Sequence, residues 1–422
     1  MNKIEVMAPA GSFDSLAAAI RAGADSVYFG VGSLNMRSRA TVNFSIDDLP
    51  KIIRLCRKAG VKTYLTLNII VYDDELTFVR NTCDAAKAAG VDAVIAADMA
   101  VIKYADKIGL PVHVSVQANV SNIESVRFYA QFADVMVLAR ELTLAQINKI
   151  ITTIDQENIC GPSGDKVRVE IFAHGALCVS VSGKCYMSLG AYNSSANRGA
   201  CFQNCRRRYR VIDEETGEEL VIDNKYVMSP KDICTIEFLD RLLESGVSIL
   251  KLEGRGRSAD YVQTVTKVYR EACNAWQRHD YTPDKIDFWL EELKTVFNRG
   301  FWRGGYYLGE PLGDWCGFGG SRAKLHKIHL GRVNKYFSKL GVAELSIEAA
   351  DLKTGQLLLV NGPTTGALKF QASEIRLAGK KVETAPKGSI VSVPVPEKVR
   401  KNDQLYMLVE RRFGEEAEGE EL

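Results

Sequence analysis

The sequence predicts an α/β fold: a (β/α)8 TIM-like barrel with a long cysteine-bearing insertion after its seventh strand, followed by a small C-terminal all-β barrel. Short apolar runs alternate with longer stretches of helical period over about the first 270 residues. One connection in this series, from Gly175 to Pro230, is far longer than the others. Beyond Ala323 the pattern changes to short alternating strands with turn residues, such as "IHLGRVNKYF" and "SIVSVPV". These three observations set the fold class.

Eight runs are expected to form the strands of the barrel, because they are short, rich in apolar and β-branched residues, and bounded by helical stretches. They are Ile4–Met7, Ser26–Phe29, Lys62–Leu67, Ala93–Ala96, Val112–Val116, Val135–Leu138, Val167–Phe172 and Ser248–Leu252. Eight strand and helix units are typical of a (β/α)8 barrel. An open doubly wound sheet is the alternative, but no G-x-G-x-x-G motif follows the first strand.

The expected helices share one ending. The amphipathic runs "AAAIRAG", "IIRLCRKAG", "CDAAKAAG" and "DRLLESG" each close on glycine just before the next strand. Glycine at this position suits a left-handed helix C-cap, since it adopts positive φ without steric cost. The repetition supports a series of βα units.

We expect the chain to have three parts. A length of 422 residues exceeds what one hydrophobic core usually serves. Residues 1–325 are predicted to form the barrel that carries the cysteine cluster, and residues 326–411 the small β-barrel. Residues 412–422 form an acidic tail, because they read "RFGEEAEGEEL" and contain little to bury.

Composition and charge narrow the class of protein. The chain is 46% hydrophobic and 25% charged, which is typical of a folded globular protein. Lys and Arg number 54 against 52 Asp and Glu, so an RNA partner would have to be bound by a local basic patch. No apolar stretch reaches the roughly 20 residues of a spanning helix, and the N-terminus has no signal-peptide core. We therefore expect a cytoplasmic location and no membrane partner.

The cysteines indicate a metal centre. In a reducing compartment ten cysteines favour metal binding or redox chemistry over structural disulfides. Four of them, Cys178, Cys185, Cys201 and Cys205, lie in the long connection with the spacing C-x6-C-x15-C-x3-C. Thiolate ligands select zinc or an iron–sulfur cluster. The spacing matches neither a zinc ribbon nor the common ferredoxin runs, so the type of centre stays open at this point.

Polar residues that follow the strands are the candidate site, because chemistry in such barrels lies at the carboxyl ends of the strands. His174 is a candidate general acid or base, with a structural role as the alternative. Glu170 and Glu253 lie on neighbouring strands and are expected either to do acid–base work or to bind arginines across the mouth. The candidate ligand-binding residues are Arg37, Gln117, Arg140, Arg255, Arg206, Arg207 and Arg208.

The last three of these arginines follow Cys205 directly. Arginine forks match phosphate or a small dicarboxylate. The alternative is a solvated run balanced by the acidic "DEETGEE" that comes soon after. Signatures of hydrolysis are missing, since the chain has no H-E-x-x-H, G-x-S-x-G or Walker A motif.

Several segments resemble one family. "MAPAG", "EIFAHGALCVSVSGKCYMS", "ANRGACFQNCRRRY", "SPKDICTIEFL", "KLEGRGRSADYV" and "FNRGFWRGGY" resemble the signatures of the collagenase-like peptidase family, U32, over nearly the whole chain. The C-terminal segment is similar to the barrel appended in that family. The historical label implies a metal-dependent protease of collagenase type, with zinc as the alternative metal.

The order of the motifs resembles the tRNA hydroxylation branch more closely. That resemblance implies formation of 5-hydroxyuridine at the tRNA wobble position, with prephenate implicated as a required metabolite. Other relatives hydroxylate a ribosomal RNA cytidine or the quinone ring, and the quinone relatives carry a four-iron (4Fe–4S) cluster. The resemblance thus implies a cluster on Cys178, Cys185, Cys201 and Cys205, although Cys234 replaces Cys205 if the fourth ligand lies further along. The expected partners are tRNA and a small carboxylate, while a protein partner or homo-oligomer stays open.

Overall fold

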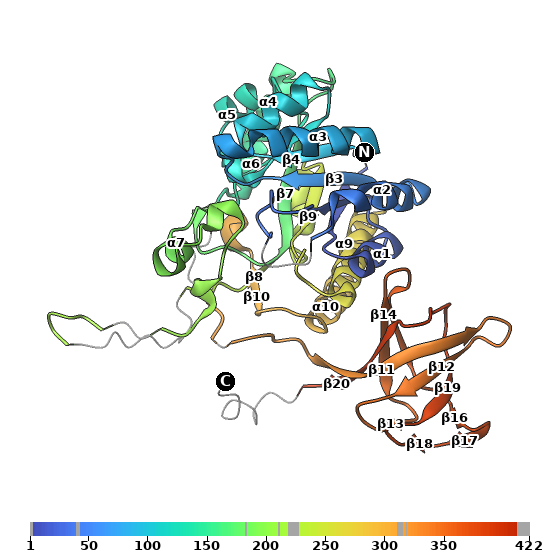
Figure 1. Cartoon of the computed structure of the whole chain (residues 1–422). Helices are drawn as coiled ribbons and strands as arrows, with labels where there is room; N and C mark the ends of the chain where they lie inside the picture. Colours follow the sequence, from blue (N-terminus) through green and yellow to red (C-terminus); the bar gives the residue numbers. More distant parts are fainter. Residues whose placement is uncertain are drawn as a thin grey trace.

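A computed structural model of the chain describes residues 3–38, 43–181, 184–209, 212–217, 228–309, 315–317 and 319–411. The expected acidic tail, 412–422, lies outside these residues. Two bodies are visible in Figure 1: a barrel with surrounding helices, and a smaller domain of strands reached through β11.

The first body is the predicted (β/α)8 barrel. Among the described residues, eight parallel strands close into a ring, because β1 pairs with both β2 and β9, and β9 pairs in turn with β7. The strands of the ring are β1 (Glu5–Pro9), β2 (Ser26–Phe29), β3 (Lys62–Leu67), β4 (Ala93–Ala96), β5 (Val112–Val114), β6 (Val135–Val137), β7 (Arg168–Gly175) and β9 (Ile249–Leu252). Each matches an expected strand to within a few residues, so the fold class is confirmed.

Helices cover the outside of this ring (Figure 1). They are α1 (Phe13–Arg21), α2 (Leu49–Lys58), α3 (Leu76–Ala89), α4 (Met99–Lys107), α5 (Ile123–Tyr129), α6 (Leu144–Glu157), α8 (Leu239–Glu244), α9 (Ala259–Gln277) and α10 (Pro283–Lys294). Their apolar faces and the outward side chains of the strands form one large core, whereas a smaller cluster fills the barrel interior. Met7, Tyr28, Tyr64 and Ile95 belong to the interior cluster.

Local sequence signals explain where these helices begin and end. Ser12 caps α1 by accepting a hydrogen bond from the backbone of Ser15, as the preference of serine for this position predicts. The four glycines expected to end helices, Gly23, Gly60, Gly90 and Gly246, have φ of 84°, 68°, 79° and 90°. These values lie in the left-handed region that glycine tolerates best.

The long connection after β7 adds elements outside the ring. It contains α7 (Met187–Tyr192) and returns through β8 (Asp232–Cys234), which pairs antiparallel with the end of β7. A further strand, β10 (Phe301–Arg303), pairs with β8. These two strands extend the sheet at the mouth of the barrel and hold both ends of the connection against β7.

The C-terminal domain is an antiparallel sheet around its own core. The strands pair in the order β15-β14-β20-β11-β12-β19-β16-β17, and β13 pairs separately with β18. Their bounds are β11 (Leu325–Phe337), β12 (Val342–Ile347), β13 (Leu352–Lys353), β14 (Leu357–Gly362), β15 (Gly366–Gln371), β16 (Ile375–Leu377), β17 (Lys380–Val382), β18 (Thr384–Ala385), β19 (Ile390–Pro394) and β20 (Gln404–Glu410). The strands expected to form a small barrel are therefore observed as an antiparallel sheet, in which β15 and β17 are the first and last strands of the order.

This domain packs against α1 and α9, on the outside of the barrel. Ala18, Ala259, Leu359, Ala367 and Leu408 form a separate apolar cluster between the two bodies. Two ion pairs flank it, since Lys327 Nζ lies 2.9 Å from Asp260 Oδ1, and Arg21 pairs with Glu397. The contact lies away from α7, so the C-terminal domain leaves the cysteine-bearing connection uncovered (Figure 1).

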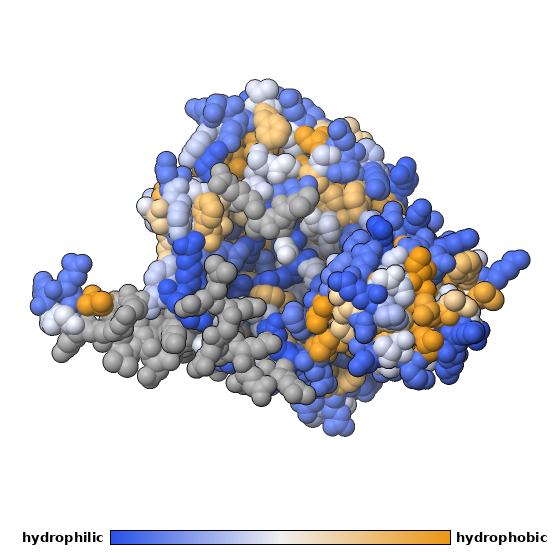
Figure 2. Space-filling model, turned by 60° about the horizontal axis from the view of Figure 1, so that its bottom comes forward, coloured by the Kyte–Doolittle hydropathy of each residue, from blue (hydrophilic) through white to orange (hydrophobic). Residues whose placement is uncertain are grey.

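The surface mixes polar and apolar side chains. On the face seen in Figure 2, hydrophobic residues are interspersed with hydrophilic ones over the C-terminal domain. Within the described part of the chain, no helix is both long enough and apolar enough to cross a membrane.

Candidate functional site

A cavity of about 260 Å³ lies at the carboxyl ends of the barrel strands, where the fold class predicts a site. Its wall is built from segments far apart in sequence. Arg37 follows β2, Gln117 follows β5, Arg140 follows β6, and Lys251 and Glu253 belong to β9 and the loop after it. The connection after β7 covers one side of the cavity with Cys178, Cys185, Cys201 and Cys205.

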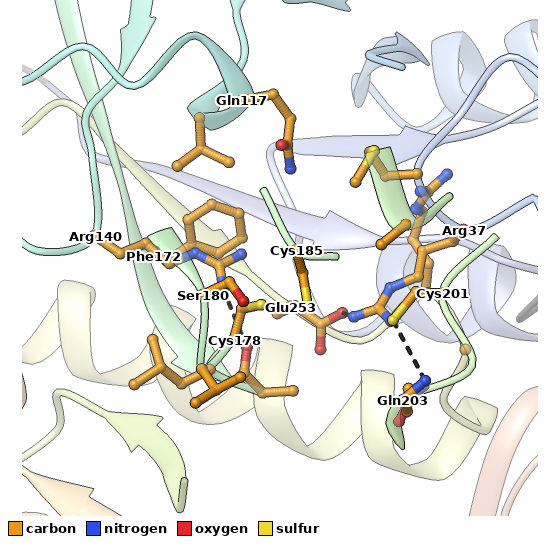
Figure 3. A pocket seen from close by; sticks show the side chains of 18 of the residues that line it. Arg37, Gln117, Arg140, Phe172, Cys178, Ser180, Cys185, Cys201, Gln203 and Glu253 are labelled. Atoms are coloured by element: carbon orange, nitrogen blue, oxygen red, sulfur yellow. Dashed lines mark hydrogen bonds and ion pairs between the residues drawn. The ribbon is translucent and has the colours of Figure 1, made fainter. Parts of the chain in front are cut away.

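The four predicted metal ligands therefore share one cavity wall. Cys178, Cys185 and Cys201 are drawn together with Arg37 and Glu253 in Figure 3. The backbone N–H groups of Met187 and Gln203 donate to the sulfur atoms of Cys185 and Cys201, both at 3.4 Å. Thiolate is the form of cysteine that binds metals.

Cys205 completes the set of thiols in the wall. Burial raises the pKa of its thiol to about 11, opposed by Arg206 and assisted by the three other cysteines. Cys234, the alternative fourth ligand, lies on β8 outside the cavity wall and is buried in the barrel core. Burial raises the pKa of Cys234 to about 12. The described side chains thus place Cys205 rather than Cys234 with the other three.

As the side chains stand, no three His, Cys, Asp or Glu groups in the described residues are close enough to hold a single metal ion. The other cysteines are separate from the cavity. Cys56, Cys83, Cys273 and Cys316 are buried and Cys160 is half-buried, and all ten cysteines of the chain are free. Most of the scattered cysteines are therefore small buried side chains, as expected.

Polar contacts fix the connection onto the barrel. Arg198 donates two hydrogen bonds to the carboxylate of Glu75 at 2.6 and 2.8 Å and stacks over the ring of Tyr72. Gly199 follows with φ of 78°, and a Cβ atom there would lie only 2.3 Å from the carbonyl oxygen of Asn35. Glycine is thus required for the close approach that brings Cys201 beside Arg37.

The cavity is strongly cationic. Among the described residues that line it are six arginines and one lysine, against two glutamates. Arg37 Nη2 lies 2.9 Å from Glu253 Oε1, which is the ion pair across the mouth that the sequence suggested (Figure 3). Burial would raise the pKa of Glu253, but Arg37, Arg257 and Arg140 together lower it to about 2. Glu253 is therefore an ionised partner of arginines and does not donate protons near neutral pH.

Arg140 presents hydrogen-bond donors to the cavity. Its guanidinium lies 3.8 Å from the centre of the Phe172 ring, and Nη1 donates to the carbonyl of Ala176 at 3.3 Å. Its Nε is buried and has no hydrogen-bond partner among the described residues. Gln117 lies across the cavity from this stacked pair (Figure 3). Arg140 therefore contributes the positive charge of its guanidinium to this side of the cavity.

Arg255 lies deeper. Its Nη1 donates to Asn35 Oδ1 at 3.0 Å and to Thr66 Oγ1 at 2.9 Å. Burial lowers its pKa to about 10, so the side chain remains charged near neutral pH. A buried charge that faces a cavity and bonds only neutral groups favours an anionic ligand.

The arginine run after Cys205 divides into two parts. Arg206 lines the cavity, but its guanidinium donates to the carbonyls of Leu177 and Pro230 at 2.5 and 2.7 Å. It therefore ties the two ends of the connection together. Arg207 and Arg208 are exposed and are not among the residues that line the cavity, and the guanidinium of Arg207 lies over the ring of Tyr192. Within the described part of the run, these two arginines are therefore on the outer surface.

His174 does not line the cavity, which corrects its expected position at the mouth. A register shift between Phe172 and His174 pairs His174 with Leu252, whose side chain belongs to the outer core. The bulge turns the imidazole away from the barrel axis. On the outer side, the imidazole packs against the rings of Tyr269 and Phe301. Burial lowers the pKa of His174 to about 3, so the imidazole is uncharged near neutral pH.

Glu170 and Glu253 do not form a carboxylate pair, which is a second correction. Glu170 is fully buried inside the barrel, and its Oε1 lies 2.7 Å from Lys251 Nζ. Glu253 is instead bound by Arg37 in the mouth. Neighbouring strands bring the two backbones together, but each carboxylate has its own cationic partner. Neither residue is placed as the acid–base pair that was one of the two expectations.

Sequence reasoning missed Lys251 and Arg299, both of which line the cavity. Lys251 had a usable signal, since a lysine within the apolar strand "SILKL" and two residues before Glu253 lies on the inward face. Arg299 had none. It comes from the loop before β10, and its Nη1 reaches Asp232 on β8 at 3.2 Å.

The sequence is similar to known proteins along most of its length. The model of peptidase family U32 matches residues 11–316. A protein named "Collagenase" from Porphyromonas gingivalis is 52% identical over 411 residues, which cover 97% of this chain and 99% of that protein. An "uncharacterized protease" from Methanocaldococcus jannaschii is 39% identical and covers 97% of this chain and 99% of its own.

A further relative has a different kind of name. "tRNA hydroxylation protein P1" from Bacillus subtilis is 33% identical over 310 residues, which cover 71% of this chain and 69% of that protein. The family match over residues 11–316 includes most of the barrel, the cysteine-bearing connection and the cationic residues of the cavity. The chain belongs to the peptidase U32 family.

Proposed function

We propose that this chain is an RNA-modifying redox protein whose cavity carries an iron–sulfur cluster and a small carboxylate. One observation carries the proposal: four thiols and six arginines of the described residues line the same cavity. Thiols supply ligands for a soft metal centre, and arginines hold an anion beside it. A hydroxylation needs a redox centre close to its substrate, and this cavity offers the means to hold both.

The donor set of four thiols fits an iron–sulfur cluster. Zinc would take the same four thiolates around one ion, so it is the alternative metal. A four-iron cluster takes one thiolate on each iron. Cys178, Cys185, Cys201 and Cys205 would hold it. When bound, such a cluster supplies one-electron redox chemistry.

The residues around the proposed cluster would orient a small acid and exclude water from the cavity. Arg140 and Arg255 both line the cavity and supply two positive charges for a carboxylate. Phe172 and Tyr28 give the cavity apolar surface that limits water. A small acid thus binds below the thiols, and Arg207 and Arg208 provide positive charge outside for an RNA backbone.

The finer proposal is formation of 5-hydroxyuridine at the tRNA wobble position, with prephenate as the acid. The tRNA hydroxylation relative supports it, since that protein is 33% identical over 71% of this chain. Hydroxylation of ribosomal RNA is supported in the same way by "23S rRNA 5-hydroxycytidine C2501 synthase" from Escherichia coli, which is 34% identical over 320 residues. A cytoplasmic location is part of this proposal.

A collagenase-like peptidase is the second candidate. The names of relatives at 52% and 39% identity favour it, and these relatives are more similar than the hydroxylation proteins. The cavity gives it less support. No histidine is among the described residues that line the cavity, and Glu253 is held ionised by arginines. A peptidase would therefore need a metal-bound water activated without a histidine base.

Nucleoside mass spectrometry of tRNA and ribosomal RNA from a deletion strain tests the proposal. Deletion, with any close paralogue, is expected to remove 5-hydroxyuridine and its derivatives from tRNA. Wild-type protein restores the nucleoside and Cys178→Ser does not, while gelatin breakdown stays unchanged. Unaltered RNA nucleosides, together with purified protein that cleaves gelatin and loses that activity in Cys178→Ser, would establish the peptidase instead.

A further inference from the structure

Lys251 is a buried amine at the floor of the cavity, and the function proposed above does not use it. The residue lies on β9, is 5% exposed, and lines the cavity wall. Its Nζ lies 4.8 Å from the centre of the Tyr28 ring and 5.5 Å from that of Phe172. Aromatic rings thus replace most of the water around this amine.

One carboxylate faces the amine from the neighbouring strand. Glu170 Oε1 lies 2.7 Å from Lys251 Nζ, and both side chains are buried. The second oxygen, Oε2, has no hydrogen-bond partner among the described residues, nor does the nearby Nδ1 of His113 at 3.8 Å. A buried ion pair with unsatisfied atoms costs stability relative to apolar side chains of similar size. The fold alone gives no reason for such a pair.

The charged groups around the pair favour its neutral form. Burial lowers the pKa of Lys251, as do Arg255 and Arg140, although Glu170 opposes them. Burial raises the pKa of Glu170, although Lys251 opposes it. Burial also keeps the facing His113 neutral. Both shifts lower the cost of moving the proton from Lys251 to Glu170, which would give an amine next to the cavity.

We propose that Lys251 forms an imine with the carbonyl carbon of a small 2-oxo carboxylate held in the cavity by Arg140 and Arg255. A desolvated lysine beside other cations is the usual nucleophile towards carbonyl compounds. The arginines hold the carboxylate, and the 2-oxo group adjoins that carboxylate. This inference rests on the proposed small-carboxylate site, and it names the chemical class of the acid.

The step balances without an oxidant or a reductant. The amine nitrogen of Lys251 bonds to the carbonyl carbon, and the carbon–oxygen double bond breaks. The oxygen leaves as water with the two amine hydrogens, one of which Glu170 carries during the transfer. Hydrolysis reverses the reaction, so the adduct forms only while the acid is bound.

Reductive trapping tests the inference on the full-length protein. The protein is incubated with pyruvate or 2-oxoglutarate and sodium cyanoborohydride, and the modified peptides are mapped by mass spectrometry. We expect a saturable adduct on Lys251, suppressed by excess lactate or succinate, which offer the carboxylate without the carbonyl group. Lys251→Arg keeps a positive charge and is expected to lose the adduct, whereas Lys267→Arg on the exposed side of α9 is expected to keep it.

The outcomes separate this inference from the proposed function. Thermal stabilisation by both oxo and non-oxo acids without any adduct on Lys251 would overturn the imine and leave the carboxylate site intact. Absence of stabilisation by any of these acids would overturn the carboxylate site itself. Mapping in the wild-type protein does not depend on the folding of a variant, and labelling spread evenly over surface lysines would also refute the inference.

Discussion

The barrel and the cysteine-bearing connection, residues 176–209, are held in different ways. In the barrel, β1, β2 and β4 are buried at every position. In the connection, large side chains are exposed, and Val181, Tyr186, Tyr192 and Phe202 are between 45% and 79% accessible. The barrel is thus stabilised by burial of its own apolar surface, which the connection largely lacks.

The connection is held mainly by hydrogen bonds of arginines. Arg206 donates to carbonyls at the two ends of the connection, and Arg198 binds Glu75 on the barrel. Hydrogen bonds of this kind are worth less than the burial of large apolar side chains. The barrel thus supplies most of the stability, whereas the connection supplies the four thiols of the cavity wall. Three predictions test this difference.

The largest expected effect comes from matched substitutions of phenylalanine in the two regions. Phe29 on β2 is fully buried, so Phe29→Ala is expected to lower the free energy of unfolding by about 3–5 kcal/mol. Phe202→Ala in the connection is expected to lower it by less than about 1 kcal/mol, because the ring is 46% exposed. Chemical denaturation measures both. Equal losses would show that the connection is part of the same cooperative core.

A smaller effect is expected from binding of a small acid. Prephenate at about 100 times its Kd should stabilise the protein by about 2.7 kcal/mol, since it binds only the folded state. Arg140→Met should weaken this stabilisation, because the acid loses its stacked guanidinium. Arg207→Met should preserve it, because Arg207 is exposed outside the cavity. Thermal unfolding with increasing acid gives the comparison, and equal responses of the two variants would contradict the assigned site.

The smallest effect concerns the stability of the barrel in mild acid. The pKa of His174 falls from an ordinary 6.5 to about 3 on folding, so the unfolded chain binds the proton first. Stability is therefore complete above the unfolded value and declines as the pH falls from 6.5 towards 3, by up to about 1.4 kcal/mol per pH unit. His174→Gln should flatten this decline above about pH 5, where carboxyl groups contribute little. His326→Gln, at an exposed position, is the control, and an unchanged slope in His174→Gln would refute the assignment.

Much of the fold follows from the sequence because burial and backbone geometry leave a periodic signal. The strands and the glycine helix ends were predictable from apolar runs and from the positive φ of residues such as Gly90. The spacing of the cysteines and the arginines at strand ends likewise indicated one mouth. A strand end fixes the position of its backbone at the mouth, so Arg37 and Arg140 were found in this way.

The remaining parts of the site depend on contacts that the sequence does not display. His174 was misplaced because one register shift in β7 reverses the inward and outward alternation. Glu170 and Glu253 lie on neighbouring strands, yet each carboxylate pairs with a cation from another segment. Lys251 pairs with Glu170, and Arg37 pairs with Glu253. Arg299 comes from outside the ring of βα units, so its arrival in the cavity depends on the pairing of β10 with β8.

The content of iron and acid-labile sulfide in anaerobically purified protein tests whether the four thiols hold an iron–sulfur cluster. We expect brown protein with about four irons and four sulfides per chain. Cys178→Ser, Cys185→Ser and Cys205→Ser should lose the cluster, whereas Cys273→Ser, buried in α9, and Cys234→Ser should keep it. Colourless wild-type protein with stoichiometric zinc, or full iron retained in Cys205→Ser and lost in Cys234→Ser, would contradict the assignment of these four thiols to an iron–sulfur cluster.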